Sequence, residues 1–311
     1  MGKSSSDYAV CAGHILKSYG DVKALDGVSF NVGHGETFGI IGPDGAGKST
    51  LFRILASLLV PDSGRALVEG LDTVADYRQV RKIIGYMPGK FSLYQDLTVE
   101  ENLQFFATLF GTTIEENYHL IKDIYSQIEP FRHRMAGKLS GGMKQKLALS
   151  CALIHKPKVL FLDEPTTGVD PVSRKEFWDM LAKLKDDGIT ILVSTPYMDE
   201  ARRCDRIALT RNGKFLKVDT PAGIEGSFRD KLFSVRSDRM HSLLGDLRSW
   251  PGTERAFSFG ESVHLSTGPG ADENGILRWL SERGHGGISV SVISPMVEDC
   301  FMAMLQDDKT E

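Results

Sequence analysis

The sequence predicts an α/β domain with a mixed sheet at its core, followed by a small α+β domain. A glycine-rich loop at 42–47 separates a short apolar strand from a helix, an arrangement typical of α/β domains. Apolar runs at 159–162 and 189–193 have the continuous hydrophobicity of strands buried on both faces. Beyond about residue 220 the element order changes to β-α-β-β-α-β. We therefore expect two domains, 1–220 and 221–311.

Composition is that of a folded, cytoplasmic chain. Its 311 residues are 41% hydrophobic, enough for two buried cores. The net charge is −4 and no run of Lys and Arg exceeds a pair, which argues against a nucleic-acid partner. The cysteines lie far apart, which suits reduced thiols: Cys11, Cys151, Cys204 and Cys300. A membrane-spanning helix needs about 18 consecutive apolar residues, and no apolar run in the sequence is that long. Any membrane role therefore has to come through a partner.

The first six residues, Met1–Ser6, have two interpretations. They match the pattern for N-myristoylation, and they equally fit a flexible polar leader. We expect the polar leader and keep acylation as the alternative.

Two strands precede the glycine-rich loop. Residues 8–16 alternate between apolar and polar positions, and 28–32 form a second such run. We expect an antiparallel β-subdomain beside the core. Tyr19 ends the first run, where it is either a platform for a stacked base or an ordinary strand-end aromatic.

The stretch Gly42–Thr50 matches the phosphate-binding pattern G-x-x-x-x-G-K-[ST]. A strand at 36–41 precedes it and a helix at 49–56 follows. Positive φ angles at the glycines would turn backbone N–H groups inward, and the helix N-terminus would add its dipole. Lys48 would reach the β- and γ-phosphates and Ser49 would ligate Mg²⁺. The nucleotide-binding residues expected here are Gly42, Asp44, Gly45, Ala46, Gly47, Lys48, Ser49 and Thr50.

A mostly helical insert is expected at about 98–135. Strands at 66–68 and 83–87 come before it, and Thr98 with Glu101 forms a capping box at its start. After it, Ser140, Gly141 and Gly142 precede a helix through Leu153. This helix start could bind an anion, or serve only as a cap.

The strand at 159–162 ends in two adjacent carboxylates, Asp163 and Glu164. Beside a phosphate loop, Asp163 would order the Mg²⁺ shell. Because neighbouring strand residues face opposite ways, Glu164 could polarise a water for attack on the γ-phosphate. The alternative is a pair of solvated loop acids. A helix at 175–184, a strand at 189–194 and a hairpin turning at Asn212-Gly213 complete the domain.

The C-terminal part reads as a split βαβ of ferredoxin-like type. Strands are expected near 232–235, 254–257, 263–266 and 288–293, with helices at 240–247, 275–280 and 297–305. It has no pattern of catalytic residues. We expect His241, His264 and His285 at the surface rather than as ligands.

Taken together, the phosphate loop, the Leu-Ser-Gly-Gly-Met block, the Asp-Glu pair and the turn Gly168–Pro171 resemble the nucleotide-binding subunit of an ABC transporter. The resemblance covers about residues 6 to 220. The remainder is similar to the accessory domain of drug and polysaccharide exporter ATPases, down to Ser294–Phe301.

The resemblance implies a mixed-sheet ATPase core and a dimer of two such subunits around two ATP molecules with Mg²⁺. Ser140, Gly141 and Gly142 would contact the γ-phosphate in the partner's site. Tyr19 would stack on adenine, and Asp170 would lie in the turn that links the two sites. Residues Lys90–Tyr94 would contact integral membrane permease subunits through exposed Phe, Leu and Tyr side chains.

Three positions depart from the family pattern. Gly89 stands where the family has a glutamine that contacts Mg²⁺ and water. Pro196 stands where the family has a histidine that reaches the γ-phosphate. Neither Gly89 nor Pro196 can donate a side-chain hydrogen bond. Asp44 replaces an asparagine. We hypothesise an exporter subunit whose own site binds ATP but hydrolyses it slowly, paired with a competent partner. A soluble non-transport ATPase and a non-hydrolysing clamp are the alternatives.

Overall fold

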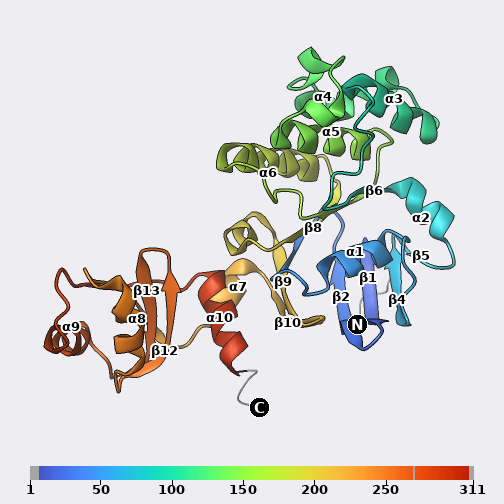
Figure 1. The fold of residues 1–311 in the computed structure, drawn as a ribbon. Helices are drawn as coiled ribbons and strands as arrows, with labels where there is room; N and C mark the ends of the chain where they lie inside the picture. The colour runs from blue at the N-terminus through green and yellow to red at the C-terminus, as the bar shows by residue number, and fades with distance from the viewer. Residues whose placement is uncertain (1–6, 269, 308–311) are drawn as a thin grey trace. The chain divides into compact units, whose positions relative to one another are not determined.

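The structure is a computed structural model that describes residues 7–268 and 270–307. The pattern at Met1–Ser6 lies outside these residues. The chain forms two compact units, Met1–Thr220 and Pro221–Glu311, which follow one another along the chain (Figure 1).

The first unit is built on a six-stranded mixed sheet of order β10-β9-β3-β8-β7-β6. Its neighbours pair in parallel except at the β10–β9 hairpin. Every residue of β3, β7 and β8 is buried, which explains their continuous hydrophobicity. The strands are β3 (Thr37–Ile41), β6 (Ile84–Met87), β7 (Val159–Asp163), β8 (Thr190–Thr195), β9 (Arg206–Arg211) and β10 (Lys214–Asp219).

Register brings the carboxyl ends of three central strands to one edge. Ile41 pairs with Thr195, and Asp163 pairs with Ser194. The phosphate-loop segment, the Asp-Glu pair and the segment after β8 therefore leave the sheet side by side. In open α/β sheets this edge is where ligands bind.

An antiparallel sheet of order β2-β1-β4-β5 lies beside the core, as predicted. Its strands are β1 (Val10–Tyr19), β2 (Val22–Val32), β4 (Ser63–Val68) and β5 (Leu71–Asp72). The two sheets share a hydrophobic core, in which Phe30 of β2 stacks on Phe38 of β3 with ring centroids 5.4 Å apart.

Helices cover the core and form the predicted insert. They are α1 (Lys48–Leu55), α2 (Tyr77–Ile83), α3 (Val99–Leu109), α4 (Ile114–Tyr125), α5 (Gly141–Leu153) and α6 (Pro171–Asp186). The insert helices α3 and α4 both begin with capping boxes, at Thr98 and Thr113. Helix α2 was not predicted, because it has seven residues and only Val80 is buried.

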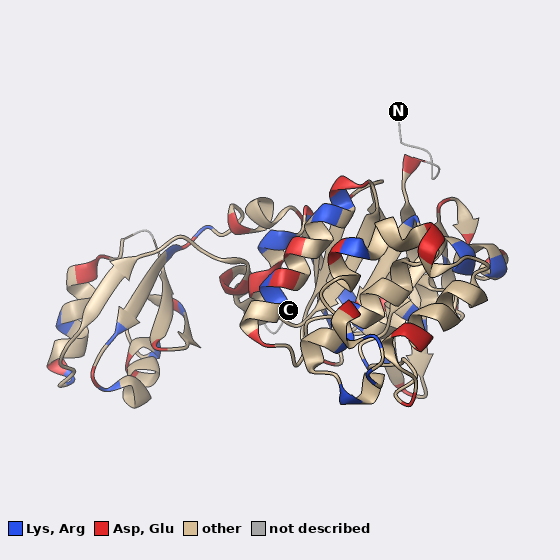
Figure 2. Cartoon of the chain, turned by 90° about the horizontal axis from the view of Figure 1, so that it is seen from above, with Lys and Arg blue, Asp and Glu red and all other residues tan. Residues whose placement is uncertain are grey.

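Exposed ion pairs connect the helices around the insert. Lys146 of α5 lies 2.8 Å from Glu176 of α6, and Lys183 of α6 lies 2.8 Å from Asp123 of α4. Figure 2 shows the acidic and basic residues of this unit interspersed along the ribbon. Such exposed pairs contribute about 0.2–1 kcal/mol each, so packing holds these helices together. Within the described residues, no helix is long and apolar enough to cross a membrane.

The second unit has a four-stranded antiparallel sheet of order β12-β13-β11-β14. Along the chain the elements run β11 (Lys231–Arg236), α8 (Met240–Arg248), β12 (Thr253–Phe259), β13 (Ser262–Thr267), α9 (Glu273–Glu282) and β14 (Ser289–Val292). A separate core forms between this sheet and helices α8 and α9. Helices α7 (Pro221–Glu225) and α10 (Val297–Asp307) begin and end the unit.

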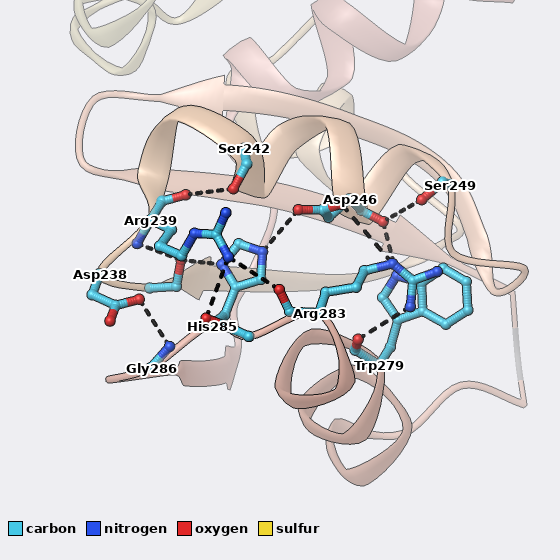
Figure 3. A network of polar contacts seen from close by, with 11 residues as sticks. Asp238, Arg239, Ser242, Asp246, Ser249, Trp279, Arg283, His285 and Gly286 are labelled. Atoms are coloured by element: carbon cyan, nitrogen blue, oxygen red, sulfur yellow. Dashed lines mark hydrogen bonds and ion pairs between the residues drawn. The ribbon is translucent and has the colours of Figure 1, made fainter.

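Two of the three histidines in this unit are buried, contrary to our expectation. His241 is exposed, but His264 and His285 are each only 6% exposed. His264 Nδ1 lies 2.7 Å from Asp299 Oδ1. His285 Nδ1 lies 2.9 Å from Ser237 Oγ, and its Nε2 lies 2.9 Å from Asp246 Oδ2 (Figure 3). Burial is tolerated because residues distant in sequence satisfy these ring nitrogens.

The His285 contacts predict an acid-sensitive second unit. The hydrogen bond with His285 holds the pKa of Asp246 below its ordinary value of 3.8. A lowered carboxyl pKa stabilises the fold above the unfolded value, and the contribution is lost as pH falls through the folded one. We expect hydrogen-exchange protection of β11 to fall below about pH 4, and Asp246→Asn to remove that part of the pH dependence. An unchanged acid response in this variant would contradict the assignment.

Candidate functional site

The loop between β3 and α1 has the backbone geometry that a phosphate cradle requires. Gly45 and Gly47 adopt φ angles of +79° and +93°, which only glycine takes readily. At Gly47 a Cβ would lie 2.2 Å from the carbonyl oxygen of Ala24. The expectation of positive φ at Gly42 is wrong. That residue is glycine because β9 is so close: its Cβ would lie 2.2 Å from Thr210 O.

Lys48 is the first residue of α1 and lies inside the loop. Its side chain is 3% exposed. The Nζ atom donates to the carbonyl oxygens of Gly42 and Pro43 at 2.8 and 3.0 Å, and lies 3.1 Å from Glu164 Oε1. A buried ammonium at the start of a helix, inside a glycine-rich loop, is well placed to meet an anion there.

The two carboxylates expected at the end of β7 differ in environment. Asp163 is 3% exposed and accepts a 2.6 Å hydrogen bond from Ser194 Oγ. Glu164 has a left-handed backbone, with φ of +50°, and its side chain is 22% exposed. The interpretation as two solvated loop acids therefore fails for Asp163. A strained residue that carries a carboxylate toward a buried lysine is typical of a functional site.

The donor set fits a magnesium nucleotide. Ser49 and Asp163 offer a hydroxyl and a carboxylate, the hard oxygen ligands that Mg²⁺ prefers. Among the described residues no cluster of three or more His, Cys, Asp or Glu could hold a metal. A cation here would thus need phosphate and water oxygens, as Mg²⁺ bound with nucleotide has.

Other expected residues surround the loop in different ways. Ala46 is buried and Thr50 half-buried, whereas the Asp44 side chain is 88% exposed, with Oδ1 3.9 Å from Lys48 Nζ. Tyr19 is 48% exposed at the turn from β1 into β2, the strand whose Ala24 contacts Gly47.

The segment Ser140–Gly142 lies at the exposed start of α5. Ser140 caps this helix by accepting from the N–H of Met143 at 3.4 Å. Gly142 packs on α6, because a Cβ there would lie 2.9 Å from Ser173 Oγ. Asp170 caps α6, accepting from the N–H groups of Val172 and Ser173.

Gly89 and Pro196 both lie next to the carboxylate edge. A Cβ at Gly89 would be 3.1 Å from Asp163 O and 3.8 Å from Asp163 Oδ2, so a side chain at 89 would start beside that carboxylate. Pro196 directly follows β8, two residues beyond Ser194.

The surface expected around Lys90–Tyr94 is only partly as predicted. Leu93 is buried, at 8% exposure, and Phe91 is half-buried. Tyr94 is 50% exposed and makes an edge contact with the exposed Phe105 of α3, centroids 4.9 Å apart. Asn102, fully buried, holds the backbone of Tyr94 by two hydrogen bonds. Leu109, also on α3, is 62% exposed. We call the two exposed aromatic residues Tyr94 and Phe105, together with Leu109, the aromatic patch.

Sequence reasoning missed Ser194. It is fully buried, and its hydroxyl contacts both residues of the Asp-Glu pair. The available signal was a serine directly after the apolar run Ile191–Val193, at the buried end of the strand.

Comparison with known proteins identifies the family. The "ABC transporter" family profile matches residues 25–167. The "Nod factor export ATP-binding protein I" of Rhizobium sp. (strain N33) is 36% identical over 303 residues, which cover 96% of this chain and 97% of that protein. The chain belongs to the ATP-binding proteins of ABC transporters. Its cassette contains the described phosphate loop and carboxylate pair.

Two further comparisons extend this result. The "Probable multidrug ABC transporter ATP-binding protein YbhF" of Escherichia coli (strain K12) is 39% identical over 92% of this chain, which spans half the length of that relative. A dimeric ATP-binding cassette solved in a post-hydrolysis state with ADP and Pi is 28% identical, with a TM-score of 0.62, over 68% of this chain and 98% of that one. The ABC ATPase fold of the first unit is thus confirmed.

Proposed function

We propose that the chain binds and hydrolyses Mg-ATP and couples this to export through separate membrane permease subunits. The convergence of Lys48, Asp163 and Glu164 at one edge of the sheet carries the proposal. The names of the relatives, a probable multidrug transporter protein and a Nod factor export protein, support the direction.

Each residue has a distinct task in this proposal. Lys48 donates hydrogen bonds to the β- and γ-phosphate oxygens, and backbone N–H groups of the loop surround the phosphate chain. Ser49 and Asp163 hold Mg²⁺, which when bound neutralises charge on the β- and γ-phosphates. Glu164 orients and deprotonates the attacking water. Tyr19, exposed at the turn from β1 into β2, stacks on the adenine.

The proposed active unit is a dimer in which each ATP lies between two subunits. Ser140, Gly141 and Gly142 then contact the γ-phosphate held by the partner, with the α5 dipole assisting. The exposure of Ser140 and Gly141 supports this, and the similar solved cassette is dimeric.

The proposed site on this chain's own loop is slow. Gly89, although beside Asp163, has no side chain to hold water, and Pro196 has no donor for the γ-phosphate. Loss of one such donor commonly costs about 100- to 1000-fold in rate, and two losses need not add. A heterodimer with a fully equipped subunit follows, in which Ser140–Gly142 complete the faster site.

The same two residues favour a second candidate, a clamp that dimerises on ATP without hydrolysing it. The candidates differ in phosphate release: the clamp dimerises with ATP and releases none, whereas the slow ATPase releases it measurably.

The aromatic patch and the cavity beside it are the proposed permease contact. The cavity, about 380 Å³, lies between the core and α5, and its lining includes Leu58, Met87, Leu93, Phe106 and Phe110. An apolar hollow flanked by exposed aromatic residues suits a segment of a protein partner. Through it the chain would be peripheral on the cytoplasmic face, without a nucleic-acid partner.

Co-purification tests this function. Tagged chain, isolated from detergent-solubilised membranes of its source cells, is expected to retain an integral membrane protein in fixed ratio. Tyr94→Ala should reduce that retention about five- to thirtyfold, since an exposed aromatic anchor often contributes about 1–2 kcal/mol. Phe131→Ala, which alters an exposed aromatic residue outside the patch, is the control. Retention of RNA in place of a membrane protein would contradict the transport function.

A further inference from the structure

We propose that Ser194 is a positioning residue that sets both carboxylates of the nucleotide site, an inference that rests on the proposed function. Ser194 lies in β8 and is fully buried. It faces Asp163 in the register of the parallel β7–β8 pair.

One hydroxyl makes both contacts. Ser194 Oγ donates to Asp163 Oδ1 at 2.6 Å and accepts from the backbone N–H of Glu164 at 3.0 Å. A hydroxyl has one proton and two lone pairs. Ser194 points its proton at Asp163 Oδ1, which leaves a lone pair free to accept from the N–H of Glu164. The two hydrogen bonds are therefore compatible.

The first contact orients Asp163. With Oδ1 occupied by Ser194, the Oδ2 atom is left for the metal, and it is this oxygen that a Cβ at Gly89 would approach to 3.8 Å. Short hydrogen bonds to an ionised acceptor are the strong ones. Ser194 thus fixes which oxygen of Asp163 faces the cation.

The second contact holds the turn of Glu164. Its φ of +50° is strained for a non-glycine residue and persists only where the surrounding structure holds it. Ser194 fixes it twice, through Oγ and through its carbonyl oxygen, which accepts from the same N–H at 3.1 Å. Removing the hydroxyl leaves the carbonyl contact, so the chain is expected to fold without it.

The alternative is that Ser194 merely satisfies buried polar groups. That role predicts a loss of stability without a specific loss of metal affinity. Ser150 offers the matched control: it is also fully buried, and its hydroxyl donates to Lys146 O within α5, away from either carboxylate.

The experiment measures Mn²⁺ affinity by electron paramagnetic resonance in full-length chain with a non-hydrolysable ATP analogue. Ser194→Ala is expected to weaken Mn²⁺ binding about tenfold, the effect of one lost hydrogen bond to a charged group. Affinity for the metal-free analogue should stay within about twofold, because Lys48 and the loop are unchanged. Ser194→Thr, which keeps the hydroxyl, should restore Mn²⁺ affinity, and Ser150→Ala should not alter it.

The outcomes separate this inference from the function beneath it. If the unaltered chain binds neither the analogue nor Mn²⁺ with it, the nucleotide-binding function is wrong and the inference is wrong with it. If the unaltered chain binds both and Ser194→Ala binds Mn²⁺ equally well, or Ser150→Ala weakens it as much, only the positioning role is overturned.

Discussion

Replacing Lys48 with alanine is expected to weaken ATP binding by about 100-fold, because charged hydrogen bonds contribute roughly 1.5–3 kcal/mol each. The Nζ atom is held in the loop by two carbonyl oxygens and Glu164, so its charge is already positioned where the phosphates would lie. Titration of a fluorescent ATP analogue measures the change.

Lys158→Ala removes an exposed lysine, with 64% of its side chain accessible, and serves as the control for net charge. It should leave the analogue affinity within about twofold, as a change away from the site does. Unaltered nucleotide affinity in Lys48→Ala, or normal export by a transporter containing it, would contradict the role of the loop.

Installing the two absent side chains is expected to accelerate hydrolysis at the chain's own site. The variant Gly89→Gln with Pro196→His should raise the rate of phosphate release by about 100-fold or more, the typical effect of one preorganised transition-state donor. The Cβ of the new glutamine would lie 3.1 Å from Asp163 O, so the end of β7 must shift by a few tenths of an ångström. Phosphate release at saturating ATP, with purified protein, is the measurement.

The matched control is Gly89→Ala with Pro196→Ala, which makes the same backbone changes without adding a donor. It should hydrolyse ATP no faster than the unaltered chain. Equal acceleration in both double variants would show that backbone freedom, rather than the missing donors, limits the rate.

Much of the first unit was predictable because its patterns are local. The strands β3, β7 and β8 each contain an apolar run, since both of their faces are buried. The capping box at Thr98 depends on contacts three residues apart. Helix α2 has neither property and was missed.

The remaining errors concern contacts between distant parts of the chain. Gly42 is required by Thr210 of β9, His285 is satisfied by Asp246 and Ser237, and Leu93 is buried in the fold. No spacing within the sequence shows these pairings. Ser194 was missed for the same reason, because its partners precede it by about thirty positions.

The central claim is that this chain holds ATP firmly but hydrolyses it slowly. Its most direct test is to load the purified full-length chain with γ-labelled ATP and Mg²⁺, and to measure bound nucleotide and released phosphate in the same sample. We predict stoichiometric binding and phosphate release at least about 100-fold slower than in the Gly89→Gln, Pro196→His variant. Equally fast release by the unaltered chain, as a homodimer, would contradict the claim.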